Sequence, residues 1–174
     1  RMKGNLVDYS EAKGALQWLL ARNARDGEAL DQLARLFYDR GVLNQSSYML
    51  LAEDAVRRGQ DLVPEGPHRA GIEVTAGLLA LTREDQTAAL EAFMAAIRMA
   101  PQHPEAHLHV GHLALGHRDF ARAQRHLLVA LDEPRVARKP DPWLTLGVVR
   151  RHLQDYAGAE EAYRQARKVA LTDP

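Results

Sequence analysis

The stretch WLTLGVVRRHLQDYAGAEEAYRQA, residues 143–166, decides the fold of this chain because its spacing occurs three times. Its glycine, Gly147, interrupts an apolar helical pattern. Glycine costs about 1 kcal/mol relative to alanine there, a cost tolerated where two helices must approach closely. From each of three such glycines, an alanine follows after twelve residues, a large side chain four further on and another alanine three beyond that. The three sets are Gly77, Ala89, Phe93 and Ala96; Gly111, Ala123, Leu127 and Ala130; and Gly147, Ala159, Tyr163 and Ala166. Intervals of 34 and 36 residues between the glycines define an internal repeat.

The composition excludes several classes of protein. The 174 residues carry 23 basic and 23 acidic side chains, so no overall charge favours nucleic acid or a membrane surface. Cysteine is absent, which excludes disulfides, thiol catalysis and thiolate metal sites. No apolar run approaches the roughly 18 residues of a membrane span, and no signal peptide is visible. The chain also has no glycine-rich phosphate loop, G-x-S-x-G or H-E-x-x-H motif, so we predict neither enzymatic activity nor a cofactor.

The repeat resembles the tetratricopeptide repeat (TPR). The run WLTLG, Trp143 to Gly147, reproduces the W-x2-L-G element of that family, and AEEAY, Ala159 to Tyr163, is similar to its A-x3-F element. The segments QDYAGA (154–159) and RDFARA (118–123) resemble the turn between the two helices of a repeat. A weaker copy places Leu30, Leu33, Ala34 and Phe37 at the same signature positions, with Gly41 at the turn.

The resemblance implies an all-α fold, a right-handed superhelical solenoid of about four antiparallel helix pairs that follow a lone N-terminal helix. Helix pairs are expected near 28–58, 70–100, 104–131 and 141–171. We expect one domain, 1–174, with a lone helix or half repeat at 8–24 and a degenerate repeat at 27–60. A linker at 61–69 would then lead to repeats at 70–103, 104–139 and 140–172. Because each repeat buries its apolar face only against its neighbours, Trp143, Phe93, Tyr163 and Phe120 are expected in the core.

The segment HPEAHLHVGHLALGH, residues 103–117, contains five histidines and raises the question of a metal site. Of these, only His109 and His112 share a helix face, since they are about 60° apart around the axis. Glu105 lies near that face, but roughly 10 Å along the axis from His112. We therefore predict no metal site. The alternatives are two histidines completed by another helix or chain, or His112 titrating alone in a groove.

The family resemblance implies a concave groove lined by the first helix of each pair. The fifth, ninth and twelfth positions of each repeat are then Asp31, Arg35 and Tyr38; Val74, Leu78 and Leu81; Leu108, His112 and Leu115; and Leu144, Val148 and Arg151. Some TPR domains hold a peptide carboxylate with lysines and asparagines at such positions, and this chain lacks that clamp. In the last three pairs the groove is mainly apolar, and water-facing positions rarely are unless something covers them.

We therefore predict a non-enzymatic interaction module or assembly scaffold that binds an apolar or amphipathic segment of a partner protein. One alternative is a structural subunit or assembly factor, permanently buried in a bacterial envelope complex such as pilus, secretion or motility machinery. A second copy of the chain could also cover the groove. The compartment stays open between bacterial cytoplasm and periplasm or envelope.

A minor alternative is binding of nucleic acid or an acidic partner through arginines on the convex face. Arg118, Arg122 and Arg125 follow helical spacing, with Arg135, Arg138 and Lys139 in the nearby loop. Because these arginines lack interleaved aromatic residues and stand in a neutral chain, a solvated surface is the preferred interpretation, and no nucleic acid or membrane insertion is expected.

Overall fold

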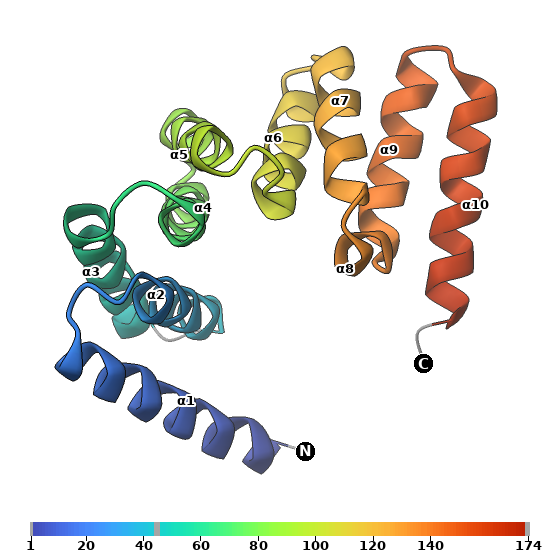
Figure 1. The fold of residues 1–174 in the computed structure, drawn as a ribbon. Coiled ribbons are helices and arrows are strands. Elements are labelled where there is room, and N and C mark those ends of the chain that lie inside the picture. The colour runs from blue at the N-terminus through green and yellow to red at the C-terminus, as the bar shows by residue number, and fades with distance from the viewer. Residues whose placement is uncertain (1, 44–45, 173–174) are drawn as a thin grey trace. The chain divides into compact units, whose positions relative to one another are not determined.

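The computed structural model describes residues 2–43 and 46–172, and every regular element within these ranges is a helix (Figure 1). The helices are α1 (Met2–Arg22), α2 (Gly27–Val42), α3 (Ser46–Leu62), α4 (Pro67–Thr82), α5 (Gln86–Met99), α6 (Pro104–Gly116), α7 (Phe120–Leu131), α8 (Pro134–Ala137), α9 (Pro140–His152) and α10 (Tyr156–Thr172). The described ranges contain no strand, which confirms the predicted all-α fold.

The chain divides into two compact units, residues 1–100 and 101–174. In the first unit α2 pairs with α3, α4 pairs with α5, and α4 also packs on both α2 and α3, while α1 packs on α2. In the second unit α6 pairs with α7 and α9 with α10, and α7 packs against α9. The repeating element is therefore a helix hairpin, as Figure 1 shows for α9 and α10.

Two connections differ from the ranges expected from the sequence. The segment 61–69 was predicted as a linker, yet α3 runs to Leu62 and α4 begins at Pro67. Proline suits the first position of a helix because its backbone angle is already helical and that position needs no N–H donor. The extra residues after α7 form the short helix α8, whose first turn is capped by the Glu133 side chain. The indole N–H of Trp143 donates to the carbonyl of Ala137 over 2.8 Å and ties α8 to α9.

Three of the helix hairpins reverse the chain with the same local device. A residue with a positive backbone φ angle precedes an aspartate that caps the next helix. The three residues are Glu84, Arg118 and Gln154, with φ of 60°, 61° and 63°, followed by Asp85, Asp119 and Asp155. Each carboxylate accepts a backbone N–H three residues on, at 2.9, 3.0 and 2.9 Å. The cap offsets part of the cost of the left-handed conformation by satisfying a donor that the helix leaves unpaired.

Each repeat glycine lies directly against the large side chain predicted to oppose it. A Cβ atom on Gly111 would lie 2.9 Å from Cγ of Leu127. On Gly77 and Gly147 it would run into the rings of Phe93 and Tyr163. Only a residue without a side chain lets the two helices of a pair come this close, so the predicted reason for the glycines is confirmed.

The buried core repeats the same pattern in each unit. In the first unit Leu30, Leu33, Phe37, Ile72 and Leu79 belong to one buried cluster. In the second, Leu127, Leu146 and Val149 do so together with small residues such as Ala123 and Ala130. Phe93 is fully buried, whereas Phe120 and Trp143 are half-buried and pack on the second cluster from its edge. The degenerate repeat in 27–60 thus contributes much of the core of the first unit.

Replacing Gly111 by leucine should destabilise the fold by roughly 1–3 kcal/mol or more, because the added side chain would overlap Leu127. Thermal or urea denaturation measures this loss. Gly116→Ala is the matched control on the same helix, since nothing lies within 4 Å of a Cβ built there. If Gly111→Leu unfolds at the same temperature as the parent, the close helix contact is not what holds the pair together.

Candidate interaction surface

The three α2 residues predicted to line the groove are engaged within their own unit. Asp31, Arg35 and Tyr38 are half-buried. Arg35 pairs with Asp39 one turn on, with Nε and Oδ1 3.2 Å apart, and its guanidinium lies 5.9 Å from the centre of the Tyr38 ring. The carboxylate of Asp31 fills the space that a side chain on Gly71 of α4 would take. Asp31 therefore contributes to the packing of α2 on α4.

The α4 residues correct one part of the sequence prediction. Val74 and Leu78 were expected to face water, but they are 1% and 5% exposed, while Leu81 is half-buried. The physical reason is that α4 is covered on most sides: Ile72, Thr75 and Leu79 are buried as well. Helices α2, α3 and α5 all pack against α4, and this packing outweighs a position inferred from repeat numbering.

In the second unit, α6 and α9 present the most accessible predicted groove residues. We define the α6–α9 face by Leu108, His112 and Leu115 on α6 and Leu144, Val148 and Arg151 on α9. The two helices meet where Nε2 of His112 lies 3.4 Å from Oγ1 of Thr145. Leu144 is 45% exposed, and His112 and Arg151 are also exposed. Leu108 and Leu115 are half-buried because they pack on the core of the unit, so the prediction that they face water holds only in part.

Charged side chains of opposite sign lie at the two ends of the α6–α9 face. Glu105 and Asp141 occupy the first turns of α6 and α9, whereas Arg151 occupies the last turn of α9. Carboxylates near a helix N-terminus and cations near its C-terminus are also favoured by the helix dipole. The apolar residues lie between these ends. The face is thus acidic at one end, apolar in the middle and basic at the other.

His112 lies near the centre of this face and is disfavoured as a cation. Its ring stands at 78° to that of His109, with centres 6.3 Å apart. Although part of the residue is exposed, desolvation of the His112 ring lowers its pKa, the nearby His109 lowers it further, and Asp141 partly opposes both effects. His112 is therefore neutral near pH 7 and adds a polar but uncharged group to the apolar middle.

The histidines do not assemble a metal site in the part of the chain that the structure describes. Nε2 of His109 lies 3.9 Å from Oε1 of Glu105, and no cluster of three or more histidine, aspartate or glutamate ligands occurs in residues 2–43 and 46–172. Nor is any described helix both long and apolar enough to cross a membrane.

Sequence reasoning missed a second histidine pair, which joins α6 to α7. Nδ1 of His107 lies 3.0 Å from Nδ1 of His126, and Nε2 of His107 lies 3.0 Å from the carbonyl oxygen of Pro101. A carbonyl only accepts, so Nε2 of His107 carries the proton and donates it to Pro101. In the neutral pair Nδ1 of His107 then accepts from Nδ1–H of His126. The pair was foreseeable: the antiparallel register that sets Gly111 against Leu127 and Ala123 also brings His107 close to His126.

Within this pair, His126 resists protonation. Burial, together with the nearby His107, Arg122 and Arg125, lowers the pKa of His126 to about 4. Of Arg118, Arg122 and Arg125, which were expected at helical spacing, Arg118 lies in the turn between α6 and α7 rather than on α7.

These features define a class of protein: an α-helical repeat protein built from hairpins of similar geometry. Residues 110–171 match the tetratricopeptide repeat family. No curated protein has a sequence that matches the chain.

Solved structures share the fold. MamA aligns with a TM-score of 0.67 at 15% identity, covering 97% of this chain and 92% of its own. YrrB, described as a TPR protein with an unusual peptide-binding site, gives 0.59 at 13% identity, with 99% and 83% covered. A thermophilic TPR protein of Thermus thermophilus gives 0.60 at 22% identity, with 99% and 88% covered. At these identities the similarity concerns the fold.

Acid should destabilise the second unit through His126. Histidine in the unfolded chain has a pKa near 6.5, above the folded value of His126, so the unfolded state binds protons first as pH falls. The free energy of unfolding should therefore decrease between pH of about 7 and about 4. His126→Phe, which keeps a ring, should flatten this decrease in denaturant titrations, whereas His117→Gln in the exposed turn should not. An unchanged pH dependence in His126→Phe would contradict the assignment.

Removal of metal ions should leave the protein unaffected, because at most two histidine side chains of the 103–117 segment approach each other on one face. We expect the same melting temperature with and without a chelator. A loss of several degrees that zinc restores would reveal a site shared between helices or chains.

Proposed function

We propose that the chain is a protein-interaction module whose second unit binds an apolar or amphipathic segment of a partner protein on the α6–α9 face. The observation that carries this proposal is Leu144, which is 45% exposed between the acidic and basic ends of that face. Val148, one turn further along α9, is half-buried and extends the apolar strip. A leucine in this position gains free energy only if a partner covers it.

The chemistry of the face also restricts the bound segment. A bare carboxylate finds no paired cationic clamp in the middle of the face. An amphipathic segment instead gains from burying leucine-sized side chains there, and helix-in-groove recognition uses such anchors. A basic residue at one end of the segment would lie near Glu105 and Asp141, and an acidic residue at the other would lie near Arg151. The description of YrrB as a peptide-binding TPR protein supports the class of ligand.

Leu144→Asp should weaken binding at least about tenfold, since burying a leucine contributes about 1.5–3 kcal/mol and one decade of affinity is 1.4 kcal/mol. Peptides selected from a random library on the parent chain provide the ligand, and their affinities for parent and variant are measured by titration. Leu153→Asp is the matched control, because Leu153 is 38% exposed and lies half a helical turn away from Leu144 around the axis. The fold of Leu144→Asp should be retained, since the side chain is not part of the core.

The selected peptides should share apolar residues at helical spacing, and their affinity should change little with salt. Peptides that bind the parent and Leu144→Asp equally, or that lose affinity steeply as salt is raised, would contradict the proposal. In the second case the binding site would be the basic residues Arg122, Arg125, Arg135, Arg138 and Lys139.

A further inference from the structure

Helix α1 carries a stripe of exposed residues opposite the face with which it packs. Glu11, Ala15, Trp18 and Arg22 fall within about 60° around the helix axis, while the buried Leu16 and Leu20 lie on the far side. Trp18 is 58% exposed, and the Arg22 guanidinium lies 4.8 Å from its ring centre. The stripe is therefore acidic at its start, aromatic in the middle and basic at its end. Exposed tryptophan is unusual on a free surface and common at the centre of protein interfaces.

The first unit also has a hollow of about 570 Å³ between α3 and α5, with α4 as its floor. Alanines make up much of its lining: Ala76, Ala80, Ala88, Ala92 and Ala95. Because alanine side chains are short, they leave room for a large side chain from outside. The hollow lies within one compact unit, and all three helices that form it belong to that unit.

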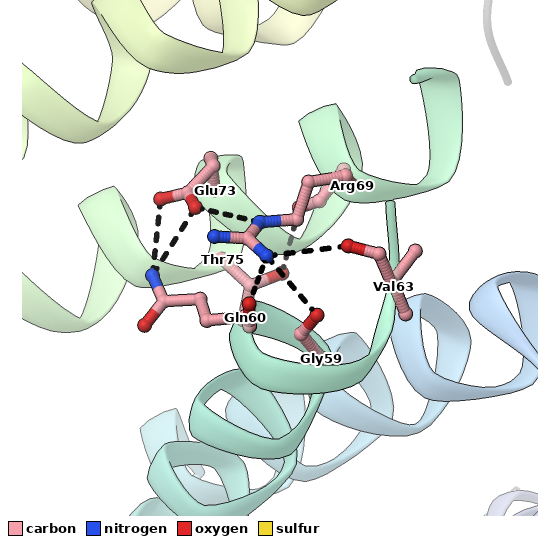
Figure 2. A network of polar contacts seen from close by, with 7 residues as sticks. Gly59, Gln60, Val63, Arg69, Glu73 and Thr75 are labelled. Atoms are coloured by element: carbon pink, nitrogen blue, oxygen red, sulfur yellow. Dashed lines mark hydrogen bonds and ion pairs between the residues drawn. The ribbon is translucent and has the colours of Figure 1, made fainter. Parts of the chain in front are cut away.

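The two walls of the hollow run in the same direction. Arg83, at the end of α4, pairs with Glu53 in the first half of α3. At the start of α4, Arg69 bonds to the carbonyls of Gly59 and Gln60 near the end of α3 (Figure 2). Helix α4 is thus antiparallel to α3, and it is antiparallel to α5 through their hairpin. Consequently α3 and α5 are parallel to each other.

Several charges of the hollow are neutralised within the unit. Glu53 is paired with Arg83, and Arg57 is paired with Asp54. Glu73, only 7% exposed, accepts from Arg69 and from the Gln60 amide, as Figure 2 shows. The exposed Glu91, in the first half of α5, and Arg98, near its end, remain. Along α5 the lining is therefore acidic at Glu91, apolar at Ala92 and Ala95, and basic at Arg98.

We propose that this hollow binds helix α1 of a second copy of the chain, with Trp18 inserted over the alanines. The incoming helix runs antiparallel to α5, so that Arg22 faces Glu91 and Glu11 faces Arg98. Glu91 and Arg98 are about 10 Å apart along their helix and Glu11 and Arg22 about 16 Å apart along theirs, a difference that the long arginine side chains span. Antiparallel helix dipoles also favour this direction.

The contact joins two different surfaces, so a pair of copies still has one unbound α1 helix and one unoccupied hollow. Such a heterologous interface forms rings or open chains rather than a closed symmetric dimer. It uses the first unit alone and is independent of the α6–α9 face.

The test is sedimentation equilibrium of the full chain over a range of concentrations. The parent should self-associate, and Trp18→Ala should raise the dissociation constant about tenfold or more. Tyr156→Ala is the control, since Tyr156 is 66% exposed on α10 and lies outside the proposed contact, and it should associate like the parent. Circular dichroism confirms that each variant is folded.

A charge exchange tests the orientation. Arg98→Glu should weaken association roughly fivefold, since it places two acidic side chains together, and Glu11→Arg added to it should restore association. A parent that stays monomeric at all concentrations would overturn the proposal. So would association that survives Trp18→Ala, or a double variant no better than Arg98→Glu alone.

Discussion

The contact between a repeat glycine and the large side chain of the opposing helix is the constraint on which the rest of the structure depends. It sets the distance between the two helices of a pair in both units, at Gly77 and Phe93 in one and at Gly111 and Leu127 in the other. Once that distance is fixed, the alanines at the following positions complete the contact between the two helices. The outer residues of each hairpin then pack against the neighbouring hairpins.

Polar groups inside the units are satisfied by partners from adjacent helices. The Arg69–Glu73 pair, with Nε and Oε1 2.9 Å apart, is held by Gln60 and by backbone carbonyls of α3. His107 is held in the same way by Pro101 and His126. Breaking one partner of a buried polar pair costs more than the pair contributes, because the remaining group stays unsatisfied. These networks fix the alignment of neighbouring helices where the alanine-rich contacts alone would permit sliding.

Much of the fold follows from the sequence because glycine, alanine and a large residue recur at fixed spacing, and each has one geometric reason to be there. The candidate surface is less predictable. Numbering within a repeat places a residue on one side of its helix, but the exposure of that side depends on what packs beside it. Val74 and Leu144 hold equivalent positions, yet one is 1% and the other 45% exposed. The His107–His126 pair is not apparent from the sequence for a related reason: its two histidines belong to different helices, so a pattern along one helix does not show it.

The three capped turns that carry Glu84, Arg118 and Gln154 have a consequence for the order in which the chain folds. Each turn reverses the backbone using residues adjacent in sequence, so a hairpin closes with a short loop and a small entropy cost. Most stabilising contacts then connect residues within a few dozen positions of each other, a low contact order typical of fast folding. Structure can start at any hairpin and spread to its neighbours, as in other linear repeat arrays. A local defect in one hairpin would accordingly slow the spread past that point while leaving distant hairpins able to form.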